Sequence, residues 1–101
     1  MDENASKGFA PENLWSHYRK HGVEFLDADA TAYNRRAQEL LRQECVGDIA
    51  GFTTADGWRF RYEKRRNELV IGRPDGFIAT YFKPVGGIAY WEKQVSKYGK
   101  R

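Results

Sequence analysis

The stretch with the greatest capacity for chemistry runs from His17 to Phe25, His-Tyr-Arg-Lys-His-Gly-Val-Glu-Phe. It holds two histidines, two cationic residues and a carboxylate within nine positions. His17 and His21 are four residues apart, so on a helix they share one face. Gly22 stands where a helix commonly places a left-handed residue after its end, which puts His21 in the last turn. A histidine there has its charged form favoured by the helix dipole and can project into a cleft.

The motifs that most enzyme classes require are missing from the sequence. The histidines have no cysteine partner and no His-Glu-x-x-His spacing, so we expect no metal. The glycines follow no phosphate-loop or dinucleotide pattern, so we expect no nucleotide cofactor. Neither the serines nor the single cysteine, Cys45, have the surroundings of a catalytic nucleophile. Histidine, lysine, arginine, hydroxyl and aromatic side chains remain, and a metal-independent ribonuclease uses such a set.

Cleavage of RNA without metal needs three kinds of group. A base takes the proton of the 2′-hydroxyl, an acid protonates the departing 5′-oxygen, and cations stabilise the phosphate charge. Histidine titrates in the range that suits the first two, and arginine holds phosphate oxygens in a fork. The alternatives are structural: His21 could be a helix-terminal residue bonded to a carbonyl, and His17 an ordinary surface residue.

The charge distribution points to a polyanionic partner. The chain has 101 residues, which predicts one domain, and its net charge is +3. Residues 1–56 carry six Lys/Arg against ten Asp/Glu, whereas residues 57–101 carry eleven against four. A basic surface with interleaved aromatics suits single-stranded or looped nucleic acid, although a solvated basic face is the alternative. No apolar run is long enough to span a bilayer, so we expect no membrane in the folded state.

Two helices are expected to position the histidines. The first begins at Pro11 and runs to His21, and the second is capped by Asp27 or Asp29 and runs to about Gln43. We expect residues 1–9 to form a flexible leader, residues 10–98 a single domain, and residues 99–101 a basic tail.

Short strands are predicted after Gly47. Trp58, Phe60 and Tyr62 alternate with charged residues, which predicts a half-buried strand with Arg59 and Arg61 on an outer, cationic face. The other expected strands are Ile49 to Thr53, Leu69 to Ile71, Phe77 to Lys83, and Ile88 to Trp91. The predicted fold is α+β, with two N-terminal helices packed on a four- to five-stranded antiparallel meander sheet.

Two segments together give the chain a family resemblance. They are the His17 to Phe25 stretch with its following helix, and Asp75 to Pro84, Asp-Gly-Phe-Ile-Ala-Thr-Tyr-Phe-Lys-Pro. In this order they resemble the colicin D-like transfer-RNA nuclease domains. That family includes C-terminal toxin domains of contact-dependent inhibition proteins and belongs to the barnase, EndoU, colicin and RelE (BECR) group. The resemblance covers roughly residues 14–91 and implies a BECR-like fold.

The resemblance implies roles for particular residues. The Lys20-His21 pair matches a helix motif whose histidine is catalytic, Thr80 matches a hydroxyl position on a late strand, and Phe82 matches an aromatic beside the substrate. Tyr18 departs from the pattern, because the family has a lysine there, so Arg19, Lys20 or Lys83 would stabilise phosphate charge. Thr80 and Phe82 alternatively fit the interior of a sheet. The candidate catalytic residues are His21, Lys20, Thr80, Lys83 and His17, and the candidate substrate-binding residues are Tyr18, Arg19, Phe82, Arg59, Arg61 and Trp91.

These expectations describe a toxin-type RNA endonuclease. Cleavage in or near a transfer-RNA anticodon loop would leave a 2′,3′-cyclic phosphate and a 5′-hydroxyl. The resemblance implies an acidic immunity protein as partner, action in the bacterial cytoplasm, and delivery as the C-terminal part of a secreted or phage-borne protein. The alternative function is a non-catalytic RNA-binding module with a basic aromatic sheet.

Overall fold

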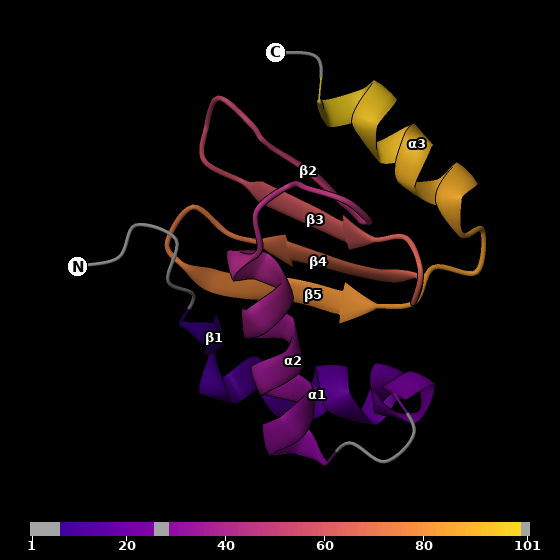
Figure 1. Cartoon of the computed structure of the whole chain (residues 1–101). Helices are drawn as coiled ribbons and strands as arrows, with labels where there is room; N and C mark the ends of the chain where they lie inside the picture. Colours follow the sequence, from indigo (N-terminus) through magenta and orange to yellow (C-terminus); the bar gives the residue numbers. More distant parts are fainter. Residues whose placement is uncertain (1–6, 26–28, 100–101) are drawn as a thin grey trace.

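The computed structural model describes residues 7–25 and 29–99, which form an α+β fold around a five-stranded sheet (Figure 1). The strands lie in the order β1-β5-β4-β3-β2. In chain order the elements are β1 (Gly8–Phe9), α1 (Pro11–His21), the 3₁₀ helix η1 (Gly22–Phe25), α2 (Ala30–Arg42), β2 (Ile49–Thr53), β3 (Arg59–Glu63), β4 (Glu68–Gly72), β5 (Phe77–Phe82) and α3 (Ile88–Tyr98).

The first two helices begin where the sequence predicts. Pro11 is the first residue of α1, where its missing N–H interrupts no helical hydrogen bond. Asp29 caps α2, and its side chain accepts the Ala32 N–H at 2.8 Å. Asp27, the other predicted cap, lies outside the described residues.

Gly22 ends α1 for a different reason from the predicted one. Its φ is −58°, which is right-handed, and the chain continues as η1 to Phe25. A Cβ atom at this position would lie 2.6 Å from the ring of Tyr18. The prediction of a left-handed residue is therefore wrong, and it is the close approach of the Tyr18 ring that favours glycine here.

The sheet is mixed rather than purely antiparallel. Strands β2, β3, β4 and β5 form the predicted antiparallel meander, but β1 pairs with β5 in parallel, with Gly8 opposite Phe77 and Phe9 opposite Ile78. Phe9 is only 4% exposed, so burial of its ring holds this short strand at the sheet edge. Residues 8 and 9, which we assigned to a flexible leader, therefore belong to the sheet.

The segment from Ile88 to Trp91 is helical, so its prediction as a last strand is wrong. It begins α3, which means that the helices are not confined to the N-terminal part of the chain. Ile88, Trp91, Val95 and Tyr98 follow one another at spacings of three or four residues, which suits one helix face. The helix directs Trp91 onto the sheet, where only 5% of the residue is exposed.

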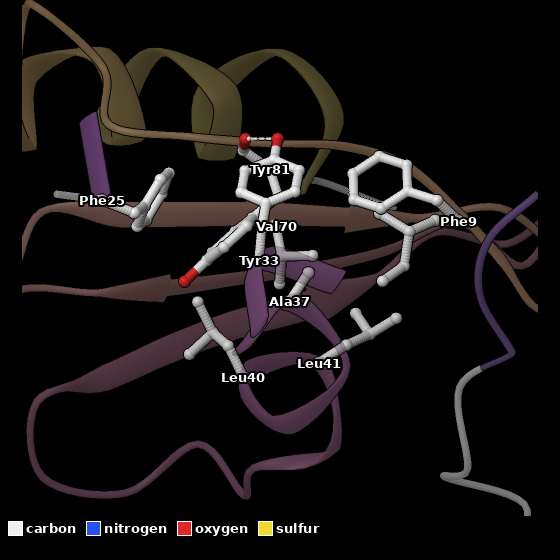
Figure 2. Close-up of a cluster of buried hydrophobic side chains, with 9 residues drawn as sticks. Phe9, Phe25, Tyr33, Ala37, Leu40, Leu41, Val70 and Tyr81 are labelled. Atoms are coloured by element: carbon white, nitrogen blue, oxygen red, sulfur yellow. Dashed lines mark hydrogen bonds between the residues drawn. The ribbon is translucent and has the colours of Figure 1, made fainter. Parts of the chain in front are cut away.

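Two apolar clusters lie on opposite faces of the sheet. On the first face, α1, η1 and α2 pack against β4 and β5, and Figure 2 shows the buried side chains there. Tyr33 lies at the centre of this cluster, and its hydroxyl donates a hydrogen bond to the Tyr81 carbonyl at 2.5 Å. On the second face, Trp91 of α3 packs with Phe60, Tyr62 and Leu69. The described helices thus cover both faces of the sheet (Figure 1).

A register shift between β4 and β5 determines which face receives the late-strand candidates. Ile71 lies opposite Thr80, but the next residue, Gly72, lies opposite Ile78, so Ala79 is an extra residue in β5. Tyr81 is buried on the α2 face, and side chains alternate along a strand. Thr80 and Phe82 therefore share the other face, the face on which α3 lies.

Candidate functional site

The strongest candidate for chemistry is a histidine–carboxylate pair at the end of α1. His21 Nδ1 lies 3.0 Å from Glu24 Oε2, because η1 tightens the chain directly after the helix. Their side chains are 17% and 30% exposed, so solvent and a ligand can reach the pair. With a proton on Nδ1 donated to the carboxylate, Nε2 is left as the acceptor in the neutral ring. The pair thus presents a basic nitrogen in a fixed orientation.

Glu24 also connects this pair to the end of β5. Its other oxygen, Oε1, accepts the backbone N–H of Lys83 at 2.8 Å. Lys83 Nζ in turn donates to the carbonyl of Arg66 at 3.1 Å and lies 5.4 Å from the centre of the Phe25 ring. One carboxylate thus bonds both the His21 ring and the backbone of Lys83, although 59 residues separate Glu24 from Lys83.

Aromatic rings complete the site. The rings of His21 and Phe82 have their centres 5.4 Å apart, and Tyr90 of α3 meets Phe82 edge-on at 5.6 Å. Phe82 and Tyr90 are half-buried, which leaves part of each ring open for stacking. We call His21, Glu24, Phe82, Lys83 and Tyr90 the His21 cluster. Thr80 lies on the same sheet face as Phe82 and pairs with Ile71 of β4.

His17 lies one helical turn from His21, with ring centres 6.4 Å apart. Its ring packs 5.0 Å from Phe9, and its buried Nδ1 has no hydrogen-bond partner among the described residues. Burial, with the nearby charges of His21 and Lys20, lowers the pKa of His17 below its usual 6.5. Together with Lys20 it lines a small open cavity of about 210 Å³. The structure therefore keeps His17 neutral at pH 7.

The remaining candidates on α1 point in different directions. Arg19 and Lys20 are exposed on the helix surface. Tyr18 is half-buried, and its ring centre lies 5.8 Å from that of Tyr33 in the core. Since its ring also fills the space beside Gly22, Tyr18 supports the end of the helix.

Arg59 and Arg61 do not form the predicted outer face. Arg59 Nη2 donates to the Leu41 carbonyl at 2.8 Å, and Arg61 Nε donates to the Gln43 carbonyl at 3.0 Å. Both arginines therefore lie on the sheet face covered by α2, where they satisfy carbonyls that the helix end leaves free. The strand is covered on both faces, because the end of α2 lies over the arginines and α3 covers Phe60 and Tyr62 on the other side.

Trp91, a predicted substrate-binding residue, lies in the second apolar cluster. Its ring stacks on Tyr62 with centres 5.5 Å apart and lies 5.6 Å from Phe52. A ring so fully covered has no face left for a base. Tyr90, its neighbour in the chain, is the aromatic residue of α3 that reaches the His21 cluster.

Sequence reasoning missed Glu24 and Tyr90 as site residues. The signal for Glu24 was its spacing of three residues from His21, which brings side chains together on a helical turn. Tyr90 gave no signal, because its position depends on a helix that was predicted as a strand.

The described residues contain no group of three or more His, Cys, Asp or Glu side chains placed to hold a metal ion. Within the same residues, no helix is long and apolar enough to cross a bilayer. The sequence matches no protein-family model, and no curated protein matches it significantly.

Proposed function

We propose that this chain is a metal-independent RNA endonuclease with His21 as its acid–base residue. The observation that carries the proposal is that Glu24 orients His21 and bonds the backbone of Lys83, while the ring of Phe82 lies against the ring of His21. RNA cleavage without metal requires proton transfer, for which His21 is placed, and cations for the phosphate charge; the aromatic ring adds a surface on which a base can stack.

The chemistry starts at the 2′-hydroxyl of the nucleotide before the scissile bond. His21 Nε2 accepts its proton as the 2′-oxygen attacks phosphorus and the bond to the 5′-oxygen breaks. The proton then passes to the departing 5′-oxygen, which leaves a 2′,3′-cyclic phosphate and a 5′-hydroxyl. Glu24 stabilises the imidazolium that forms between these steps, and Lys83, with exposed Lys20, stabilises the charge on phosphate.

The substrate that fits best is RNA with unpaired bases, since stacking on Phe82 or Tyr90 needs a base that is free of its own helix. Within this class we propose transfer RNA, a role as a toxin domain in the bacterial cytoplasm, and an acidic immunity protein as partner. These three points rest on the resemblance of the His17 to Phe25 and Asp75 to Pro84 segments to colicin D-like domains.

One feature favours a second candidate function. Phe82, Tyr90 and Lys83 could stack bases and bind phosphate without any proton transfer, which describes a non-catalytic RNA-binding module. In that case the His21–Glu24 pair would serve only to fasten α1 to β5.

The products distinguish the two functions. The purified chain should cleave total transfer RNA in buffer containing EDTA, and the fragments should carry 2′,3′-cyclic phosphate and 5′-hydroxyl ends. Enzymatic end-labelling checks this, because a 5′-hydroxyl accepts phosphate from a kinase without prior phosphatase treatment. If the chain binds RNA but leaves it intact, with or without a divalent metal, the endonuclease proposal is wrong and the RNA-binding module is favoured.

A further inference from the structure

A second polar site lies close to the His21 cluster. An open cavity of about 590 Å³ lies between α2, the end of β3 and the start of β4. Three arginines and three glutamates line it, Arg35, Arg36, Arg66, Glu39, Glu63 and Glu68. The fixed charges of the lining cancel, so the cavity suits a polar ligand without a large net charge better than a run of phosphates.

The carboxylates at the cavity floor are buried, and one of them has an oxygen that is not engaged in a hydrogen bond with the described part of the chain. Glu68 is 3% exposed; it accepts the Tyr81 hydroxyl at 2.8 Å and pairs with Arg66 Nε at 3.5 Å. Glu63 is 7% exposed, and its Oε1 accepts the backbone N–H of Arg66 at 2.6 Å. Within the described residues Glu63 Oε2 has no partner. A buried carboxylate with a free oxygen facing a cavity is an acceptor for ligand N–H groups.

The arginines at the walls supply the opposite kind of group. Arg35 and Arg36 are exposed on α2, and neither makes a hydrogen bond or ion pair within the part of the chain that the structure describes. Their guanidinium groups can only donate. The cavity therefore offers acceptors at its floor and donors at its mouth, which is the complement of a planar ligand with donors on one edge and acceptors on the next.

Guanine is the base with this arrangement. Its N1–H and N2–H are adjacent donors, which suit a carboxylate, and its O6 and N7 are adjacent acceptors, which suit an arginine. Adenine and cytosine each offer one amino group beside a ring acceptor, and uracil has no amino group. A carboxylate floor under arginine walls therefore selects guanine among the four bases.

The cavity is also joined to the proposed catalytic residues. Arg66, which forms one wall, accepts Lys83 Nζ on its carbonyl at 3.1 Å, and Lys83 is held by Glu24 beside His21. We propose that this cavity binds a guanine base of the RNA substrate next to the scissile phosphodiester. The inference rests on the proposed function for its substrate and adds the base that the protein selects.

Mononucleotides test the cavity without any bond to cleave. Calorimetric titration of the full chain with 5′-GMP, 5′-AMP, 5′-CMP, 5′-UMP and inorganic phosphate should show GMP bound at least tenfold more tightly than AMP, in the range expected for one well-made base contact. Equal binding of the four nucleotides, or phosphate bound as tightly as GMP, would overturn the proposal.

Variants locate the binding. Glu63→Gln keeps an oxygen for the Arg66 N–H but turns an amide donor towards the ligand, so GMP affinity should fall about tenfold while AMP affinity stays. Arg35→Gln should weaken the binding of GMP. Arg42→Gln is the control, because it makes the same change at an exposed residue of α2 outside the cavity, and it should leave GMP binding unchanged. Thermal melting checks that each variant folds. Unchanged GMP affinity in both Glu63→Gln and Arg35→Gln would overturn the site.

The test of guanine binding and the test of RNA cleavage can fail independently of each other. His21→Ala should bind GMP as well as the wild type, because the ring of His21 does not line the cavity. If GMP binding depends on Glu63 but the chain cuts no RNA, the nucleotide site is supported and the nuclease function is contradicted. If RNA cleavage depends on His21 but the chain does not select GMP, the nuclease function is supported and the guanine site is contradicted.

Discussion

At the scale of single residues, Glu24 joins the two halves of the proposed active site. One oxygen orients His21 and the other fixes the backbone of Lys83, so a single side chain determines where both groups lie. Glu24 does not itself touch the reacting atoms in this account. It is a positioning residue whose charge stabilises the protonated ring of His21.

Replacement of Glu24 by Gln separates charge from geometry. Glu24→Gln retains one oxygen that can accept the Lys83 N–H, but it loses the negative charge beside His21. The cleavage rate should fall, but by less than the roughly hundred- to ten-thousand-fold that loss of the acid–base residue costs. Rates of transfer-RNA cleavage, with melting curves as a check on folding, test this. A rate equal to that of the wild type would mean that Glu24 has only a structural role.

Tyr81 should be important for stability. Its hydroxyl donates to Glu68, and burial with the adjacent Glu68 carboxylate raises the pKa of Tyr81, so the hydroxyl keeps its proton. Tyr81→Phe removes the donor from a buried carboxylate and should lower the free energy of unfolding by about 1–3 kcal/mol. Tyr62→Phe is the matched control, because that hydroxyl donates to the neutral, less buried Asn67 and its loss should cost less. Equal urea midpoints for the two variants would contradict this ranking.

At the scale of elements, Trp91 is the buried anchor of α3 on the sheet. It stacks on Tyr62, while the more exposed Tyr98 stacks on Phe60. Coverage of the aromatic rings on the second sheet face therefore depends most on Trp91. The half-buried ring of Tyr90 depends on the same anchor for its place beside Phe82.

Trp91→Ala should accordingly destabilise the fold by about 3–5 kcal/mol, the usual cost of truncating a buried aromatic residue. Trp15→Ala should change stability little, since Trp15 is 59% exposed. Urea unfolding followed by circular dichroism compares the two variants. If Trp91→Ala were as stable as Trp15→Ala, the packing of α3 on the sheet would be wrong.

Elements with local start signals could be predicted from the sequence, and those that depend on distant partners could not. Pro11 and Asp29 mark their helices by their own chemistry. Phe9 joins the sheet only because β5 offers an edge about 70 residues later. Arg59 and Arg61 looked solvent-facing because an alternating pattern does not reveal a helix packed over the second face.

At the scale of the whole molecule, the candidate site lies where the end of α1 meets the end of β5 (Figure 1). The resemblance led us to expect His21, Thr80 and Phe82 near one another, and the structure brings His21 and Phe82 into contact. The carboxylate that orients the histidine and the charged cavity behind Arg66 depend on three-dimensional packing, so periodicity and composition could not reveal them.

The most direct test of the central claim is the cleavage of total transfer RNA by His21→Ala in the presence of EDTA. Loss of the proton-transfer group should lower the rate by about a hundred- to ten-thousand-fold while circular dichroism and RNA affinity stay close to the wild type. His21→Asn should behave in the same way as His21→Ala, and His17→Ala should lose much less activity. A His21→Ala protein that cuts transfer RNA as fast as the wild type would contradict the account.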